Sequence, residues 1–369
     1  MTFGAAGCPP RPDGRPRWAG RPTPGALRAG RSARTLCLRR FLLPDIRGVP
    51  TKHTCRLLRE LARVPRRVRP AWGPGWGPHP AAPVPGLSNP YPPGGRDPHR
   101  RLYISLPERC PVRVTVVGSG TLLPNDRHRS PAHLVEYGDQ RILLDCGPGS
   151  VHGLDRDGRE WRAISHVAIT HFHTDHMGDL PALFWAWTHG AGPWHGTRRT
   201  VVGPRGMRRV LEAMSVAYGD YILDPGSPLE VVELEPGGCR TLGSGAIGIR
   251  AHGTVHTTES LAFRLDGGGC AVGYTGDTGA HTPLGSFFSG VDLLISECSV
   301  PDGSPHCNHL SPSQVADLAL AAGARRLVLT HMYPTVDPDE AVAVIRAAGF
   351  AGGIDVGTDG LVRELTPMP

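Results

Sequence analysis

Four metal-ligating side chains stand within six consecutive residues of the chain. They belong to THFHTDHMGDL, residues 170–180, which directly follows a β-branched run. Alternate residues of an extended segment point to the same side, so His171 and His173 can face one ion. Asp175 and His176 follow as the chain bends, and they can face a second ion beside it. Imidazole and carboxylate suit zinc and its first-row neighbours, so the segment predicts a metal site at the end of a strand.

Three further candidate ligands stand at turns or just beyond predicted strands. His256 lies in VHTTESLAFR, Asp277 in the glycine-flanked YTGDTG, and His331 in LVLTHMYP. A carboxylate in a turn such as that of Asp277 can bridge two ions. Each of these signals is weak alone, but their order along the chain and their positions after strands form a coherent set.

The pattern of the chain from Val112 onward predicts an α/β fold. Short β-branched runs punctuated by glycine predict strands, among them VRVTVVG, AHLVEYG, RILLDCG and AISHVAIT. Further strands are predicted at residues 229–234, 247–251, 260–265, 271–274, 292–296 and 326–329. Helical periodicity predicts three helices, at about residues 206–218, 312–322 and 338–348. Many strands with helices inserted between the later ones predict two sheets packed face to face and covered outside by helices.

Residues 1–110 have a different composition from the rest of the chain. They hold 20 of the 38 prolines and carry a net charge of +16, which leaves −9 for residues 111–369. No periodic apolar face is visible in them, and such a segment cannot bury enough apolar surface to offset its ordering entropy. We therefore expect residues 1–110 to be a disordered Pro/Arg/Gly-rich extension and residues 111–369 to be the folded domain.

Cysteine use and hydropathy favour a soluble, cytoplasmic protein without membrane partners. The nine cysteines include no CxxC pair, which argues against a disulfide framework and a thiolate zinc site. We expect Cys146, Cys270 and Cys298, on or beside predicted strands, to be small buried hydrophobes. No run reaches the length of a membrane span or of a secretory signal. The sequence is compatible with a homodimer.

The order of the motifs resembles the metallo-β-lactamase superfamily over roughly residues 112–369. The resemblance implies an αββα sandwich, in which two packed β-sheets are flanked by helices. It also implies two divalent ions, which we expect to be Zn²⁺, with Mn²⁺ or Fe²⁺ as alternatives. The ligands implied for one ion are His171, His173 and His256. Those implied for the other are Asp175, His176 and His331, with Asp277 bridging.

Two more residues acquire a meaning from this resemblance. Asp145, in LLDCGPG, matches an aspartate that supports the metal-binding loop without binding metal. His252 competes with His256 for the place of the third histidine, but only His256 is followed by ESLAFR in the register of the superfamily.

Within the superfamily, the details resemble the ribonuclease Z and phosphodiesterase branch. The segments that match it are GSGTLLPN, LDCGPG, HTTESLAFR, SECS and HLS, the last two at residues 296–299 and 309–311. This resemblance implies that Glu297 couples to His309 and that His309 protonates the leaving oxygen. It further implies hydroxide held between the ions as the nucleophile toward phosphorus, with Asp175 among the catalytic residues.

Two departures weigh against RNA as the substrate. Ribonuclease Z has a Ser-Arg pair after the last histidine, where this chain has Met332 and Tyr333, and its basic glycine-rich arm is not evident here. An acidic core also lacks the positive field that binds a phosphate backbone. A phosphodiesterase is the first expectation, and a hydrolase of carboxylic esters, thioesters, sulfate esters or lactones is the alternative. A nucleic-acid-binding protein with a vestigial site is the third.

Overall fold

The part of the chain that the computed structural model describes, residues 111–243 and 247–367, contains two seven-stranded β-sheets. In spatial order, the first sheet is β14 (Val362–Leu365), β1 (Val112–Gly118), β2 (Ala132–Tyr137), β3 (Gln140–Leu144), β4 (His166–Ala168), β5 (Arg199–Pro204) and β6 (Leu229–Leu234). The second sheet is β13 (Gly353–Val356), β12 (Arg326–Thr330), β11 (Leu293–Glu297), β10 (Cys270–Tyr274), β9 (Leu261–Gly267), β8 (Ile247–Gly253) and β7 (Cys239–Leu242).

Both sheets combine antiparallel and parallel pairing in the same proportions. In the first sheet, β14, β1, β2 and β3 pair antiparallel, and β3 to β6 pair parallel. In the second sheet, β7 to β10 pair antiparallel, and β10 to β13 pair parallel. The carboxyl ends of neighbouring parallel strands lie at one edge of a sheet, which is where α/β proteins bind ligands. The loops after β3 and β4 in one sheet, and after β10, β11 and β12 in the other, are therefore suited to carry a site.

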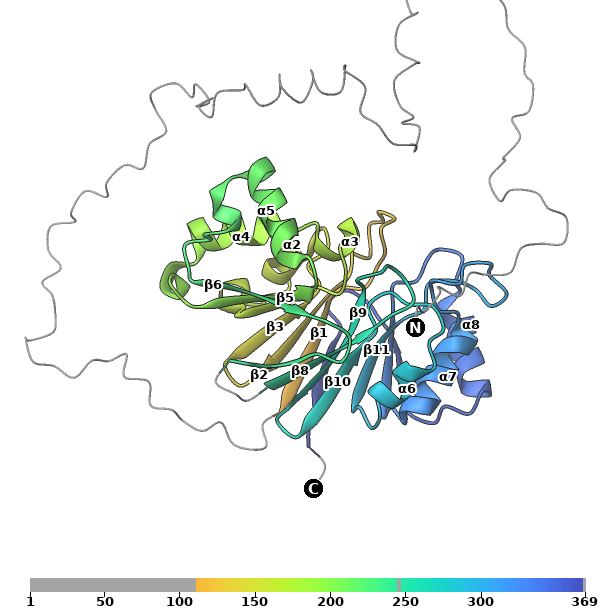
Figure 1. The fold of residues 1–369 in the computed structure, drawn as a ribbon. Coiled ribbons are helices and arrows are strands. Elements are labelled where there is room, and N and C mark those ends of the chain that lie inside the picture. Colours follow the sequence, from red (N-terminus) through yellow and green to blue (C-terminus); the bar gives the residue numbers. More distant parts are fainter. Residues whose placement is uncertain (1–110, 244–246, 368–369) are drawn as a thin grey trace, which may run out of the picture. The chain divides into compact units, whose positions relative to one another are not determined.

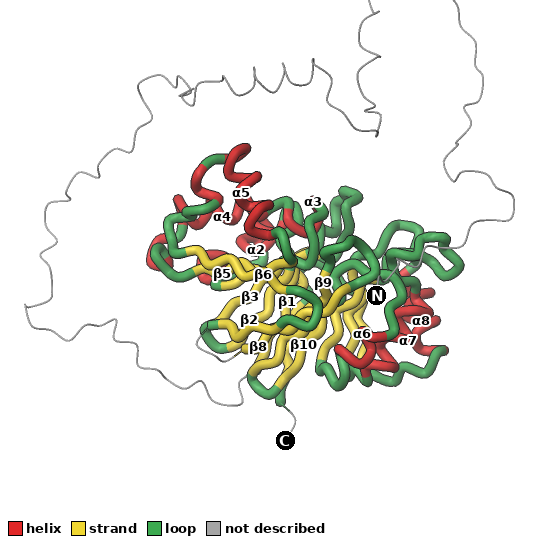
Figure 2. The backbone as a smooth tube through the Cα atoms, in the orientation of Figure 1, coloured by secondary structure: helices red, strands yellow, loops and turns green. Residues whose placement is uncertain are grey.

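Helices cover the outer faces of the two sheets (Figure 1). The α-helices are α2 (Ser150–Arg156), α3 (Thr174–Met177), α4 (Leu180–Gly190), α5 (Met207–Tyr218), α6 (Pro283–Phe287), α7 (Pro312–Ala322) and α8 (Pro338–Ala347). Short 3₁₀ turns are η1 (Trp161–Ala163), η2 (Gly192–Trp194) and η3 (Asp220–Ile222). Figure 2 shows α2, α4 and α5 on the side of the first sheet and α6, α7 and α8 on the side of the second.

Three apolar clusters hold these layers together. The central cluster lies between the sheets and joins residues of the first, such as Val114 and Val135, to residues of the second, such as Phe263 and Val272. A second cluster packs α6, α7 and α8 on the outer face of the second sheet. A third packs α4, through residues such as Trp187, on the outer face of the first. The predicted sandwich of two sheets flanked by helices is confirmed.

Most predicted elements of the folded part are confirmed, with a few additions. All three predicted helices form, and the Gln314 side chain accepts from the backbone N–H of Ser311 at 3.0 Å, as in a capping box. The patterns did not reveal the helices α2, α3, α4 and α6 or the edge strands β7, β13 and β14. They also missed β5, because a strand buried on both faces shows no alternation. Cys146, Cys270 and Cys298 are buried, as expected.

The extension predicted over residues 1–110, with its expected disorder, lies outside the described residues. Among the described helices, none combines the length and the apolar character needed to cross a membrane.

Candidate metal centre

Loops at one edge of each sheet bring the predicted ligands together. The first ligand group consists of His171 and His173, from the loop after β4, and His256, from the loop between β8 and β9. His173 Nδ1 lies 2.9 Å from His171 Nε2 and 3.1 Å from His256 Nε2. Three imidazole nitrogens therefore converge on one point, although His171 and His256 are 85 positions apart in the sequence.

The second ligand group consists of Asp175 and His176 on α3 and His331 after β12. Asp175 Oδ2 lies 3.3 Å from His331 Nε2 and 3.6 Å from His176 Nε2. All three side chains are buried. The four-residue helix α3 thus turns Asp175 and His176 away from the first group and toward the end of β12.

Asp277 faces both ligand groups with one carboxylate oxygen each. Its Oδ2 lies 3.6 Å from His256 Nε2 and 4.0 Å from His171 Nε2. Its Oδ1 lies 3.3 Å from His176 Nε2 and 3.6 Å from His331 Nε2. A carboxylate in this position has the geometry to bridge two cations.

Two buried polar atoms of the centre test whether the site fits metal ions. Within the described residues, neither His176 Nε2 nor Asp277 Oδ1 has a hydrogen-bond partner. A buried polar atom without a partner costs about 1–3 kcal/mol, so native proteins rarely tolerate two of them facing each other. A cation between these atoms would satisfy both, and the donor set of imidazoles and carboxylates suits a divalent first-row metal.

Backbone strain also concentrates at this edge of the sheets. Asp145 and His331 are the two non-glycine residues in the described ranges with positive φ, at 56° and 54°. Each is held by a backbone hydrogen bond, from Asp145 N to Ala168 O at 2.8 Å and from His331 N to Ser119 O at 2.9 Å. Strained backbone of this kind costs about 1–3 kcal/mol and clusters at functional sites.

Asp145 lies behind the ligand groups and supports them. Its Oδ2 accepts from His176 Nδ1 at 2.7 Å, from Tyr274 Oη at 2.7 Å and from Thr170 Oγ1 at 2.9 Å. Because a carboxylate only accepts, Nδ1 of His176 carries a hydrogen, which leaves Nε2, facing Asp277, as the nitrogen that can bind a metal ion. This agrees with the supporting role that the sequence resemblance implied.

Glu297 and His309 lie beside the two ligand groups. His309 Nδ1 lies 3.0 Å from Glu297 Oε2, and Glu297 is the buried last residue of β11. A nitrogen of His309 also lies within 4.8 Å of ligand atoms of both Asp277 and His331. His309 therefore reaches the space between the ligand groups while Glu297 holds its far nitrogen.

Several groups of the centre have pKa values that depart from the ordinary ones, and those of His171, Asp277 and His309 bear most directly on its chemistry. Burial lowers the pKa of His171 well below its usual value, and the nearby His176 lowers it further, which favours the neutral imidazole that binds metal. Burial opposes ionisation of Asp277, but His331 and His176 outweigh it and hold its pKa well below the usual range. Burial lowers the pKa of His309 too, but the hydrogen bond and charge of Glu297 outweigh it and raise this pKa.

The structure separates the candidate residues that belong to the centre from those that do not. His252 lies on β8 with its Nδ1 2.8 Å from Gly253 O and its ring against His281, so His256 is the histidine that joins the first group. Sequence reasoning missed Thr170, Ser299 and Tyr274, whose hydroxyls bond ligands or their supporting carboxylates. Their positions next to predicted ligands and strand ends were the available signal.

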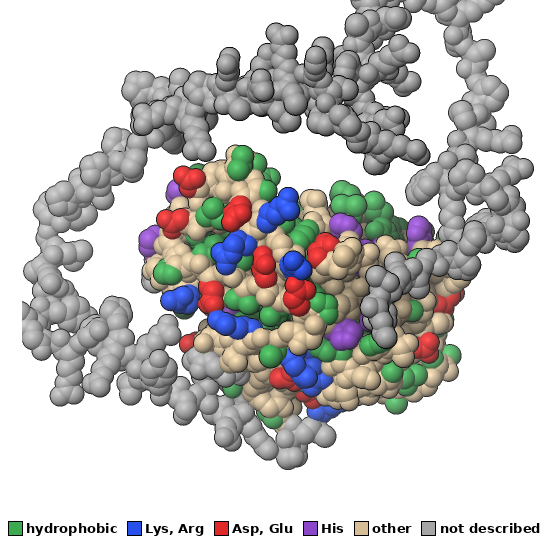
Figure 3. Space-filling view, viewed as in Figure 1, with side chains coloured by type: hydrophobic (Ala, Val, Ile, Leu, Met, Phe, Trp, Pro, Cys, Tyr) green, Lys and Arg blue, Asp and Glu red, His purple; other side chains and the backbone are tan. Residues whose placement is uncertain are grey.

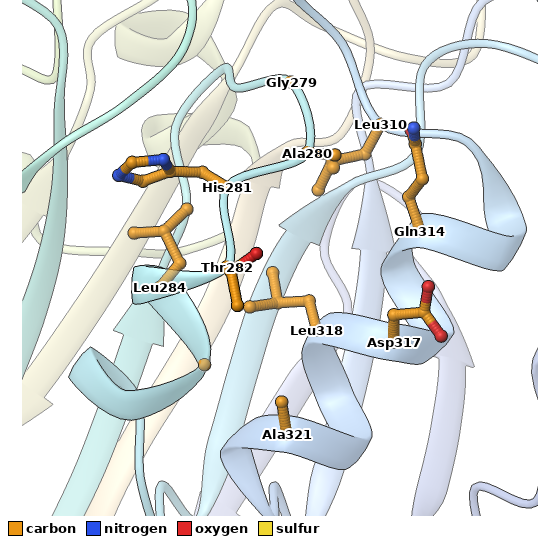
Figure 4. Close-up of a pocket in the computed structure, with 11 residues that line it drawn as sticks. Gly279, Ala280, His281, Thr282, Leu284, Leu310, Gln314, Asp317, Leu318 and Ala321 are labelled. Atoms are coloured by element: carbon orange, nitrogen blue, oxygen red, sulfur yellow. The ribbon is translucent and has the colours of Figure 1, made fainter.

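A pocket of about 310 Å³ adjoins the segments that carry Asp277 and His309. It lies between the loop after β10, helix α6 and helix α7 (Figure 4). Its apolar lining includes Leu284, Leu310 and Leu318. Its polar lining includes His281, Gln314 and Asp317. The pocket begins two residues beyond Asp277, at Gly279, and includes the residue that follows His309.

Comparisons with known proteins agree with this geometry. A ribonuclease Z of Mycobacterium bovis is 29% identical over 274 residues, which cover 67% of this chain and 96% of that protein. An uncharacterized protein of Mycobacterium tuberculosis is 32% identical over 254 residues, which cover 66% of this chain and 91% of that protein. The fold is shared with a metallo-β-lactamase fold protein from Bacillus subtilis, with a TM-score of 0.59, 24% identity and coverage of 69% and 99%. The short form of human tRNase Z shares the fold with a TM-score of 0.56 and 21% identity, and the match covers 69% of this chain and 100% of that protein.

The family comparison covers the centre itself. The model of the beta-lactamase superfamily domain matches residues 140–332, which is more than half of the chain and includes the whole segment from Asp145 to His331. This fold family implies divalent metal ions, for which the two ligand groups offer suitable donors. The chain therefore belongs to the beta-lactamase superfamily, in its metallo-β-lactamase fold, and is a metal-dependent hydrolase.

Proposed function

We propose that the chain is a phosphodiesterase that uses two divalent metal ions. The observation that carries the proposal is the placement of Asp277, whose two oxygens face two separate ligand groups beside the Glu297–His309 pair. The names of relatives such as the ribonuclease Z of Mycobacterium bovis support a phosphodiester as the substrate class.

The residues that would hold the ions are the two ligand groups and Asp277. The first group would hold one ion and the second group the other, with Asp277 between them. Imidazole and carboxylate donors favour Zn²⁺, with Mn²⁺ and Fe²⁺ as the alternatives. When bound, such ions supply a nucleophile from water at neutral pH and neutralise charge on the phosphoryl oxygens.

His309 would supply the proton for the leaving oxygen. Its Nδ1 donates to the buried carboxylate of Glu297, so its Nε2 is the atom that can give a proton to the substrate. The raised pKa of His309 keeps a larger share of it protonated near neutral pH, as a general acid requires. An alkoxide leaving group gains most from such a proton, which is why this pair favours a phosphodiester over an activated ester.

A small diester fits the centre better than a long nucleic acid. Within residues 111–243 and 247–367, no arginine forms a hydrogen bond or ion pair with either ligand group, and this part of the chain has no lysine. On the face shown in Figure 3, basic side chains alternate with acidic ones and form no single basic field. Tyr333 is half-buried with its ring against His309 and His331, and it takes the sequence position that the resemblance to ribonuclease Z assigns to the arginine of the Ser-Arg pair.

The test is a comparison of substrates on the purified, zinc-loaded protein. We expect turnover of a bis-aryl phosphodiester and of a small alkyl or nucleotide diester to exceed turnover of an aryl sulfate, a lactone, a thioester and precursor tRNA. Faster hydrolysis of the lactone, thioester or sulfate would assign the centre to the alternative ester chemistry. Efficient tRNA cleavage would overturn the preference for small diesters.

A further inference from the structure

Glu297 is the hub of a hydrogen-bond network that reaches beyond His309. Its side chain is 1% exposed and accepts from four donors. These are Thr278 N at 2.5 Å, Leu310 N at 3.2 Å, His309 Nδ1 at 3.0 Å and the hydroxyl of Ser299. An ionised carboxylate offers about four acceptor sites, so this network uses the full capacity of Glu297.

Ser299 links this carboxylate to the second ligand group. Its Oγ lies 2.9 Å from His331 Nδ1 and also bonds Glu297 Oε2. Glu297 can only accept, so the single hydroxyl hydrogen of Ser299 points to it and Oγ must accept from His331 Nδ1–H. This leaves Nε2, the atom that lies 3.3 Å from Asp175 Oδ2, as the nitrogen of His331 that can bind a metal ion.

We propose that Ser299 is a positioning residue that links the carboxylate of Glu297 to His331 by hydrogen bonds. One buried carboxylate then orients both a metal ligand and the proton donor His309. The His309 end of this inference rests on the proposed function, whereas the His331 end rests on metal binding alone. The first ligand group has the same device, because Thr170 Oγ1 bonds Asp145 Oδ2 and lies 3.1 Å from His171 Nδ1. Each sheet thus supports one histidine by a carboxylate acting through a hydroxyl.

Backbone hydrogen bonds hold Ser299 in this position. Cys298 N donates to Thr330 O at 2.9 Å, and Ser299 N donates to Leu310 O at 3.0 Å. Tyr333 N donates to Ser299 O at 3.3 Å. Ser299 is therefore tied to the segment of His331 on one side and to that of His309 on the other.

The experiment compares Ser299→Ala with Ser296→Ala. Ser296 is a matched control, because it is buried and, among the described residues, its hydroxyl bonds only the backbone oxygen of Glu297. Zinc affinity is measured by competition with a chelator, and the Co²⁺ absorption spectrum reports the coordination. We expect Ser299→Ala to bind one of two ions about 10- to 100-fold more weakly, as is typical when a partner of a metal ligand is lost. Ser296→Ala should keep both affinities within about twofold.

Two further measurements separate positioning from packing. Ser299→Thr keeps the hydroxyl and should restore most of the zinc affinity, while thermal unfolding of each metal-free variant shows that it is folded. Ser299→Ala should also lower the turnover of an alkyl diester more than that of an activated aryl diester, because Glu297 then holds His309 less firmly. Wild-type zinc affinity in Ser299→Ala, or equal losses in both alanine variants, would overturn the proposal. Absence of diesterase activity in the wild type would contradict the proposed function and leave the zinc result decisive for Ser299.

Discussion

The two sheets hold their metal-facing residues in different ways. The first sheet presents His171, His173, Asp175 and His176 from one loop and the short helix α3, all after β4. The second sheet presents His256, Asp277 and His331 from three loops that only strand pairing brings together. The first arrangement is a local segment, whereas the second exists only because β10, β11 and β12 end at the same edge. Ligands of the second sheet should therefore depend more on tertiary contacts than those of the first.

The largest expected effect comes from Asp277, the residue that faces both ligand groups. Reconstituted wild-type protein should contain two zinc ions per chain by elemental analysis, and Asp277→Ala should contain fewer. Turnover of a diester should fall by more than the 10- to 100-fold typical of residues that only support ligands. Asp266→Ala on β9, whose carboxylate pairs with Arg250, is the control and should keep both ions. A wild-type content of one ion or less would contradict the bridging role.

The next largest effect concerns His309 at the end of the second sheet. His309→Ala should keep both ions but lose about 10²- to 10⁴-fold in turnover of an alkyl diester, the usual contribution of a general acid. A nitrophenolate leaves well without a proton, so an activated aryl diester should lose little. Glu297→Gln should show a milder version of this pattern. If both substrates suffered equally, His309 would position the substrate or support the fold instead.

A smaller effect tests the first sheet against the second through Thr170. Thr170→Val removes the hydroxyl between Asp145 and His171 and should lower the affinity for one zinc ion by about 10- to 100-fold. Thr115 is the matched control, since its buried hydroxyl has no hydrogen-bond partner in the described residues. Thr115→Val should leave zinc affinity unchanged. A loss in Thr170→Val well below that in Ser299→Ala would show that the local segment preserves its geometry with less support.

The smallest effect concerns the ion pair that joins the two sheets at their edges. Asp355 on β13 pairs with Arg363 on β14 and Arg326 on β12. The hydrogen bond from Arg363, with that from Arg326, outweighs burial and lowers the pKa of Asp355. Because both pairs are partly exposed, Asp355→Asn should cost about 0.5–1 kcal/mol of unfolding free energy at pH 7.

The pH dependence of that loss follows from the lowered pKa. Asp355 contributes its stability fully above the unfolded-state pKa, about 3.9, and loses it as the pH falls through the lower folded-state value. Denaturant unfolding of Asp355→Asn and wild type should therefore differ at pH 7 and converge in strong acid. A difference that persists unchanged in acid would point to packing instead of charge.

Local patterns in the sequence were sufficient for much of the fold. Helices α7 and α8 could be predicted because their periodicity is local, and their caps at Ser311 and Asp337 are likewise made within four residues. Strands β5 and β13 were not predicted, because their burial and pairing depend on distant parts of the chain. Residues 1–110 fall outside the described part of the chain, and their disorder stays a prediction.

The residues of the candidate site also divide into those that a local pattern predicts and those that depend on distant parts of the chain. The four ligands of residues 171–176 follow from the sequence by itself, since an extended segment and one helical turn fix their relative directions over a few residues. The choice of His256 over His252 needed the resemblance to a family. In the structure β8 ends at Gly253, so His252 stays on the strand and His256 lies in the following loop beside His173. The resemblance implied that Asp277 bridges the ions, but only the tertiary structure decided which of its oxygens faces which ligand group and that Ser299 joins Glu297 to His331. These contacts join residues that are close only when parallel strands end at a common edge, and no local pattern encodes that register.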